Sequence, residues 1–169
     1  MKTLVIDSHK ELLHTTRAIV YQPVVLDILR DFGILDTVKQ HAFLNTQGIS
    51  YRDIGGNELA RIPMPENEYV LLIGQWRMNG LILGELERYP SVEVRFNHQY
   101  VGCEQDSQRV KIMVHESDRD EDLEFTADWV VGTDGVNSNV RRSLCIPFEG
   151  YSFLDFKMIG ADVFYDFGK

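Results

Sequence analysis

The chain has 169 residues, of which 44% are apolar and 25% are charged, as is typical of one globular domain with a real core. Its net charge of −9 argues against a nucleic-acid partner, and no apolar run approaches the roughly 18 residues of a membrane span. The five histidines show no metal-binding spacing, and Cys103 and Cys145 form no CxxC pair. This cysteine usage favours a reducing, cytoplasmic setting over a disulfide framework.

An apolar run near the N-terminus, Thr3–Ile6, predicts a buried parallel strand that ends at Asp7. An acidic residue at the end of a second Rossmann strand can accept hydrogen bonds from a ribose, but that arrangement needs a glycine-rich loop about 20 residues earlier. No GxGxxG occurs in the chain. Asp7 is therefore either a strand-ending turn residue, which the residues alone favour, or part of a nucleotide site in a chain that starts too late.

A loop and two helices are predicted next. The polar residues 9–21 indicate a loop that carries Arg17. Pro23 suits a first helical turn, apolar residues follow at helical spacing, and Gly33 is a good C-terminal stop. A shorter helix is expected after Asp36, and we interpret this helical pair as scaffold.

Between residues 43 and 65 the sequence pattern changes from helical to strand-like. Phe43–Asp53 and Glu58–Pro63 are predicted strands, and the glycines between them indicate a hairpin. The short apolar segment Tyr69–Ile73 then leads into a helix that begins near Gln75. Gln75 either donates to a ligand or is a solvated residue at a helix end, and the residues alone favour the second reading.

Three alternating strands follow, at Val92–Phe96, Val110–Val114 and Leu123–Ala127. The acidic run Glu116–Glu124 is expected to be the solvated tip of a hairpin between the last two. Together the strands predict a small antiparallel element that connects parallel strands and leads into the next apolar segment, Trp129–Val131.

Trp129–Val131 is a predicted strand, and the tight turn Asp134-Gly135 follows it. Ser138 offers an N-cap hydroxyl for a helix. In α/β proteins such turns lie at the carboxyl ends of strands, where ligands bind, and the N–H groups of a helix start favour an anion. Arg141-Arg142 would add positive charge there. The alternative is a surface turn capped by serine with solvated arginines, and spacing alone does not separate the two.

In their order, these motifs resemble a known family. Asp134-Gly135-x-x-Ser138-x-Val140-Arg141, after Val130-Val131-Gly132, is similar to the DG motif of FAD-dependent aromatic-ring hydroxylases, the single-component flavoprotein monooxygenases. The resemblance extends over nearly the whole chain. It includes the acidic strand end at Asp7, the loop and helix after Arg17, the helix that begins at Gln75 and the segment Ile146–Gly150.

The resemblance implies an α/β fold: a partial FAD-binding Rossmann-like domain, like that of para-hydroxybenzoate hydroxylase, with an inserted β-sheet portion of a substrate domain. Residues 1–42 and 66–150 would form the FAD-binding part. Residues 43–65 and 151–169 would form the substrate-domain sheet, which would include a strand at Lys157–Tyr165.

The function that the resemblance implies is FAD-dependent hydroxylation of a small aromatic, phenolic substrate with NAD(P)H and O2. No nucleic acid or membrane would be involved. Carried over by position, the cofactor-binding residues would be Asp7 at the adenosine ribose, Arg17 at the pyrophosphate or isoalloxazine, Gln75 at the phosphate–ribityl portion, Val101 near adenine through its backbone, and Asp134 with Gly135 in an element shared by FAD and NAD(P)H.

Two departures from the family pattern concern missing motifs. The chain has neither the GxGxxG loop nor the later GD motif, so it is expected to be a fragment that is inactive alone. The alternative is a non-catalytic remnant or truncated gene product that keeps an α/β core without functional FAD binding. A truncated gene model, an alternative start and a degenerate copy remain open, as do the aromatic substrate, NADH against NADPH, and the oligomeric state.

Overall fold

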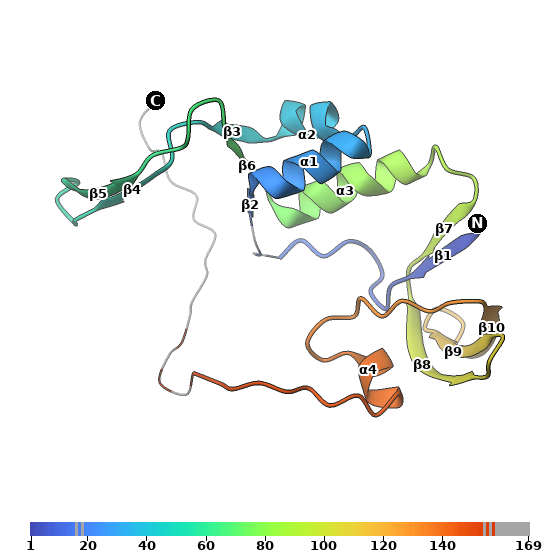
Figure 1. The fold of residues 1–169 in the computed structure, drawn as a ribbon. Helices are drawn as coiled ribbons and strands as arrows, with labels where there is room; N and C mark the ends of the chain where they lie inside the picture. Colours follow the sequence, from blue (N-terminus) through green and yellow to red (C-terminus); the bar gives the residue numbers. More distant parts are fainter. Residues whose placement is uncertain (16, 18, 154, 156, 158–169) are drawn as a thin grey trace. The chain divides into compact units, whose positions relative to one another are not determined.

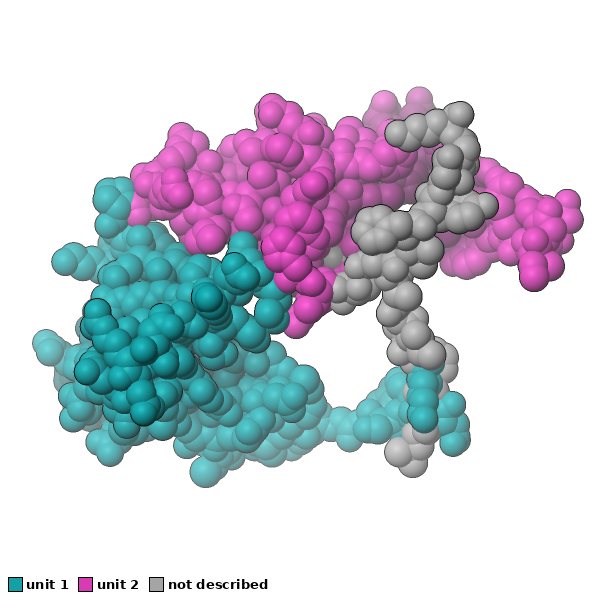
Figure 2. Space-filling model, turned by 180° about the vertical axis from the view of Figure 1, so that it is seen from behind, with its two compact units in different colours: residues 1–13, 90–158 teal, residues 14–89, 159–169 magenta. Residues whose placement is uncertain are grey.

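The structure, a computed structural model, describes residues 1–15, 17, 19–153, 155 and 157. The chain divides into two compact units. Unit 1 comprises residues 1–13 and 90–158, and unit 2 comprises residues 14–89 and 159–169 (Figure 2). None of the helices in the described part of the chain is long and apolar enough to span a bilayer. Each unit is described by itself below.

Three helices gather in unit 2 (Figure 1). They are α1 (Pro23–Asp31), α2 (Leu35–His41) and α3 (Gln75–Leu86). The predicted start of α1 at a proline and its stop at Gly33 are confirmed, and the φ of +73° at Gly33 is a conformation that favours glycine. The buried core of the unit consists of Leu26, Leu29, Ile34, Leu35, Val38, Leu71, Ile73 and Met78.

A small antiparallel sheet completes this core. Its central strand β6 (Val70–Leu72) pairs with β2 (Val20–Tyr21) on one side and β3 (Phe43–Asn45) on the other. Leu71 in β6 is fully buried against the helices. The apolar segment that predicted this strand therefore contributes directly to the core.

The hairpin of β4 (Ile49–Arg52) and β5 (Glu58–Ile62) forms a separate two-stranded sheet. The prediction of one continuous strand over Phe43–Asp53 is wrong. The side chain of Asn45 accepts the backbone N–H of Gly48 at 3.0 Å and donates to its carbonyl at 2.9 Å. This side-chain turn, with Gly48 at a φ of +90°, ends β3 before β4 begins.

Unit 1 contains a parallel pair formed by β1 (Thr3–Ile6) and β7 (Val92–Arg95). The parallel strand predicted at the N-terminus is confirmed, but its expected burial is not, because Leu4 and Val5 are 37% and 42% exposed. The assignment of Val92–Phe96 to the antiparallel element is also wrong, since its strand pairs with β1 instead.

The antiparallel element of unit 1 is a three-stranded sheet in the order β10-β9-β8. It consists of β8 (His98–Gln105), β9 (Val110–Glu116) and β10 (Glu121–Ala127). The predicted hairpin of the last two strands is confirmed, whereas β8 was not expected from the sequence. The middle strand is the best buried, with Val114 only 1% exposed.

After β10 the chain leaves the sheet. Trp129–Val131 was predicted as a strand, but it pairs with no described strand, and Trp129 and Val131 are 83% and 81% exposed. The segment then turns into the short helix α4 (Asn139–Ser143). The strand expected at Lys157–Tyr165 lies, apart from its first residue, outside the described residues.

Candidate functional site

The Asp134 carboxylate is engaged by the start of α4. Its Oδ1 accepts the hydroxyl of Ser138, and its Oδ2 accepts the backbone N–H groups of Asn139 at 2.5 Å and Val140 at 3.2 Å. Gly135 follows at a φ of +78°, which allows the chain to turn back toward its own aspartate. The turn is therefore held by its own acidic side chain.

The N-cap predicted for α4 is confirmed. Ser138 is buried, and its Oγ accepts the backbone N–H of Arg141 at 3.0 Å while its proton goes to Asp134. Partial burial opposes ionisation of Asp134, but the hydrogen bonds from Ser138 and from two backbone N–H groups outweigh that effect and lower its pKa. An ionised carboxylate at this helix start is also the charge that a helix N-terminus favours.

The segment that precedes the Asp134 turn packs closely against α4, where Gly132 contacts Val140. A Cβ atom added at Gly132 would lie 2.9 Å from Cβ of Val140 and 3.0 Å from its Cγ1. Real side chains do not tolerate such contacts, so any larger residue would push the segment away from the helix. Gly132 thus fixes how closely the turn can lie on α4.

The two arginines of α4 bind the turn itself. Arg141 donates to the carbonyl of Val136 at 2.7 Å, and Arg142 donates to the carbonyl of Asn137. The guanidinium of Arg141 also lies over the ring of Phe148, 4.6 Å from its centroid. Both side chains therefore hydrogen-bond to the turn, while Arg142 remains exposed.

Val101 occupies a β-bulge. In the pairing of β8 with β9, Tyr100 lies opposite Val114 and Gly102 lies opposite Met113, so Val101 has no partner residue on β9. It is 56% exposed. Bulges re-aim a strand locally and occur next to binding sites. The backbone of Val101 is accordingly not committed to a residue pair in the sheet.

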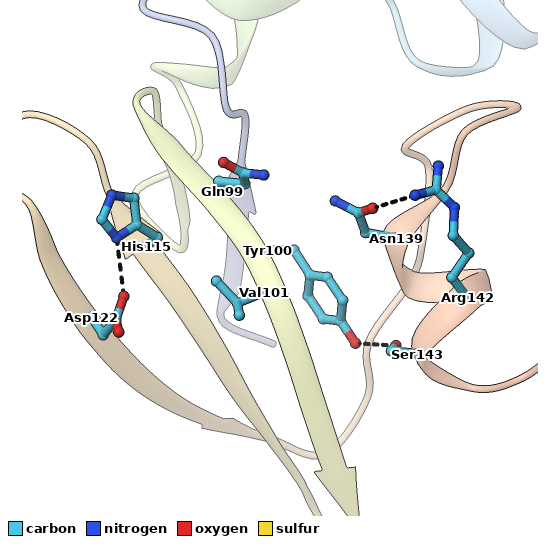
Figure 3. Close-up of a pocket in the computed structure, with 8 residues that line it drawn as sticks. All are labelled: Gln99, Tyr100, Val101, His115, Asp122, Asn139, Arg142 and Ser143. Carbon is cyan, nitrogen blue, oxygen red and sulfur yellow. Dashed lines mark hydrogen bonds and ion pairs between the residues drawn. The ribbon is translucent and has the colours of Figure 1, made fainter.

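An open depression with a volume of about 560 Å³ lies between β8 and α4 (Figure 3). Tyr100 reaches from β8 toward α4, where its Oη lies 2.7 Å from Oγ of Ser143. Amide, hydroxyl and aromatic groups predominate in the lining, which suits a planar group with its own donors and acceptors. The lining residues are Gln99, Tyr100, Val101, His115, Asp122, Asn139, Arg142 and Ser143.

Asp7 is joined to the start of the same sheet. Its backbone N–H donates to the carbonyl of Arg95, and its carbonyl accepts the N–H of His98, the first residue of β8, each at 2.9 Å. Its Oδ1 accepts from the backbone N–H of His9 at 2.8 Å and lies 2.8 Å from Nδ1 of that ring. The side chain is about half exposed. Unit 1 thus carries four of the predicted site residues: Asp7, Val101, Asp134 and Gly135.

The other two predicted residues belong to unit 2. Gln75 is the first residue of α3, and Nε of Arg17 donates to Oγ1 of Thr15 at 3.1 Å. The rings of His14 and Trp76 stack with centroids 4.3 Å apart. This stack joins the loop that carries Arg17 to the first turn of α3, and nothing in the sequence pattern indicated it.

Sequence reasoning also missed most of the residues around the depression. The strand that carries Gln99 and Tyr100 was not predicted, and Ser143 was treated only as part of a helix. The one available signal was the helical spacing of Asn139 and Ser143, four residues apart, which places them on the same side of α4.

Comparisons with known proteins identify the family of the chain. A family described as "FAD binding domain" matches residues 1–165. Para-nitrophenol 4-monooxygenase of Pseudomonas sp. strain WBC-3 is 28% identical over 173 residues, covering 99% of this chain and 42% of the relative. A 3-(3-hydroxy-phenyl)propionate/3-hydroxycinnamic acid hydroxylase of Mycolicibacterium gilvum is 29% identical, covering 89% of this chain and 26% of the relative.

Solved structures agree as well. The crystal structure of p-nitrophenol 4-monooxygenase PnpA from Pseudomonas putida has a TM-score of 0.81 at 27% identity and covers 89% of this chain and 39% of that one. The flavin-dependent monooxygenase PieE, solved with FAD and substrate, shares the fold at a TM-score of 0.77, 24% identity and coverages of 89% and 29%. This chain therefore spans less than half the length of each of these relatives. Because the family match covers nearly all of it, the chain belongs to the FAD-binding domain family of FAD-dependent aromatic-ring hydroxylases.

Proposed function

We propose that this chain provides part of the cofactor site of an FAD-dependent monooxygenase that uses NAD(P)H and O2 to hydroxylate a small phenolic substrate. The observation that carries the proposal is the turn held by Asp134, which lies in the same unit as the acidic strand end at Asp7 and the bulge at Val101. The names of the relatives, a para-nitrophenol monooxygenase and a 3-(3-hydroxy-phenyl)propionate hydroxylase, support the substrate class.

The donor and acceptor groups of unit 1 fit the adenosine half of FAD. The Asp7 side chain is half exposed, and its Oδ2 accepts no hydrogen bond from any described residue, so it can accept from ribose hydroxyls. Val101 is exposed and has no partner residue on β9, so we assign its backbone to the edge of adenine. The carboxylate of Asp134 is hydrogen-bonded within its own turn. Its proposed role is therefore to hold the turn, and Gly135 with it, in position for the cofactor.

The two predicted residues of unit 2 are assigned to the other half of the cofactor by their positions in the family motifs. Arg17 is exposed and supplies the positive charge that a pyrophosphate requires, and Gln75 at the start of α3 supplies an amide for the phosphate–ribityl portion. Bound FAD would supply the redox chemistry with NAD(P)H and O2. The chain's own residues bind and orient the cofactor.

The domain division is part of the same proposal. Residues 1–42 and 66–150 serve the cofactor, whereas residues 43–65 and 151–169 belong to a substrate-domain sheet. The separate pairing of β4 with β5 supports the division for these two strands, whereas β3 at its edge pairs with β6 of the cofactor part. We place the reaction in the cytoplasm, where NAD(P)H is available and Cys103 and Cys145 stay reduced.

As a separate polypeptide, the 169 residues are proposed to bind FAD weakly and to turn over no NAD(P)H. Pyrophosphate is normally met by the N–H groups of a GxGxxG loop, and the chain contains none. We expect a dissociation constant of about 100 µM or weaker, which corresponds to roughly −5.5 kcal/mol. The alternative function, a non-catalytic remnant that keeps the α/β core, predicts no specific FAD binding at all.

Titration of flavin fluorescence separates these two functions. Asp134→Ala should weaken FAD binding at least about five-fold, because the turn loses the acceptor that holds it. Asp106→Ala is the matched control, since Asp106 also accepts two backbone N–H groups, of Gln108 and Arg109, in an exposed turn and also has a lowered pKa. Equal effects of the two substitutions would contradict the proposed site.

Competition by pieces of the cofactor sharpens the same test. If unit 1 binds the adenosine half, ADP should displace FAD, and riboflavin should displace it far less well. Preferential displacement by riboflavin would refute the assignment of Asp7 and Val101. Aromatic-dependent NAD(P)H oxidation by the isolated chain would refute its proposed inactivity.

A further inference from the structure

The small helix α4 cannot hold its own position. It has five residues and no buried residue, and isolated helices of this length are unstable in water because nucleation is costly. The segment before it, Trp129–Val131, belongs to no described sheet. The place of α4, and with it the place of the Asp134 turn, must therefore be set by contacts with another element.

Most polar contacts of α4 are local and cannot supply that anchor. Asp134, Ser138, Arg141 and Arg142 bond within the turn and the helix. Among the described residues, one hydrogen bond ties α4 to the sheet, between Oη of Tyr100 and Oγ of Ser143 at 2.7 Å across 43 positions in sequence. Figure 3 shows this contact bridging β8 and α4.

The direction of this hydrogen bond follows from proton counting. Oγ of Ser143 lies 2.9 Å from the carbonyl oxygen of Val140 and donates its single proton there. Tyr100 is then the donor and Ser143 the acceptor. Burial, with a further contribution from the thiol of Cys103, raises the pKa of Tyr100, and the hydrogen bond with Ser143 opposes this only in part. The phenol therefore keeps its proton throughout the neutral range.

Tyr100 is also the residue directly before the bulge at Val101. One short piece of β8 thus carries both the exposed, unpaired residue Val101 and the anchor of α4. We propose that Tyr100 and Ser143 are positioning residues that fix the spacing between the Val101 bulge and the Asp134 turn, and so set the affinity of the site for the adenosine half of FAD. The effect on FAD affinity rests on the proposed function, whereas the effect on the spacing of the bulge and the turn does not.

The experiment compares Ser143→Thr with Ser143→Val in the full chain. Both side chains are β-branched and nearly equal in shape, but only threonine keeps the acceptor hydroxyl. Amide hydrogen exchange is followed at Leu144, Cys145 and Ile146, whose N–H groups close the last turn of α4. We expect exchange about five-fold faster in Ser143→Val and changed by less than about two-fold in Ser143→Thr.

Tyr100→Phe removes the bond to Ser143, whereas Ser143→Val removes that bond and also the bond from Oγ to the carbonyl of Val140. Tyr100→Phe should therefore speed exchange by no more than Ser143→Val does, and the double variant should match Ser143→Val. Tyr89→Phe, at an exposed tyrosine, is the matched control and should leave exchange unchanged. The thermal midpoint of each variant shows whether the chain remains folded. Equal exchange in the threonine and valine variants would overturn the anchor.

FAD titration of the same variants, carried to millimolar FAD, tests the second part. The dissociation constant should rise about five-fold in Ser143→Val and Tyr100→Phe and recover in Ser143→Thr. Faster exchange with an unchanged dissociation constant would overturn the positioning role. If the parent chain binds no FAD, the proposed function is contradicted instead, while hydrogen exchange still decides whether the anchor exists.

Discussion

Two apolar segments of unit 1 differ in strand pairing and in side-chain burial. β9 is paired on both sides, by β8 and β10, and its Val114 is 1% exposed. Trp129–Val131 is also apolar and follows β10 in the chain, yet it pairs with no described strand, and its Val131 is 81% exposed. The difference lies in the partners and not in the composition, since a strand requires neighbours for its backbone groups and its side chains.

The same contrast applies within the site. The Asp134 turn is ordered by hydrogen bonds that its own residues provide, so it forms without help from a sheet. β1 has one partner, β7, and leaves Leu4 and Val5 exposed. Local polar contacts therefore define the turn, whereas the apolar segments beside it depend on pairing.

The largest expected effect on the free energy of unfolding comes from replacing a valine by alanine, once in β9 and once in Trp129–Val131. Val114→Ala should lower the free energy of unfolding by about 2 kcal/mol, because it leaves a cavity in the paired sheet. Val131→Ala should change it by less than about 0.5 kcal/mol, because that side chain is already in solvent. Urea unfolding followed by circular dichroism measures both. Similar losses in the two variants would mean that Val131 is buried against a partner.

A smaller effect is expected at the glycines beside the turn. Gly132→Ala should destabilise the Asp134 turn by about 1.5 kcal/mol, since its new Cβ would collide with Val140. Gly135→Ala meets no close atom and has only the strain of its positive φ, about 1 kcal/mol. Hydrogen exchange at the amides of α4 reports the local opening. If Gly135→Ala proved the more damaging, the close approach to α4 would not be what limits position 132.

The smallest effect concerns pH. The folded state lowers the pKa of Asp134, so its ionised form stabilises the turn fully above the ordinary value of 3.8. That contribution is lost as the pH falls through the lower, folded value. The difference in α4 protection between the parent chain and Asp134→Asn should therefore be constant near neutral pH and shrink below about pH 3.8. A difference that grew on acidification would show the opposite sign of coupling.

Sequence reasoning succeeded where the signals are local. Pro23 and Gly33 bound α1, and Ser138 caps α4, because each acts through its own backbone within a few residues. The order of the motifs also identified the family, whereas the roles of Asp134 and Gly135 in cofactor binding stay predictions. These features need no knowledge of the rest of the fold.

The failures concern features that depend on distant partners. β8 was missed because its buried positions include His98 and Gly102, so no apolar alternation marks it. Trp129–Val131 was predicted as a strand because its composition suits one, but no described strand lies beside it. The contact between Tyr100 and Ser143 spans 43 positions, and no spacing rule predicts such a pair.

The central claim is that the adenosine half of FAD binds unit 1 at Asp7, the Val101 bulge and the Asp134 turn. Amide chemical shifts of the labelled chain, recorded during titration with FAD, test it most directly and tolerate weak binding. We predict that the shifts of Asp7, Val101 and Gly135 move together with one dissociation constant, while those of the β4–β5 hairpin stay in place. Shifts confined to that hairpin, or no shifts at millimolar FAD, would contradict the account.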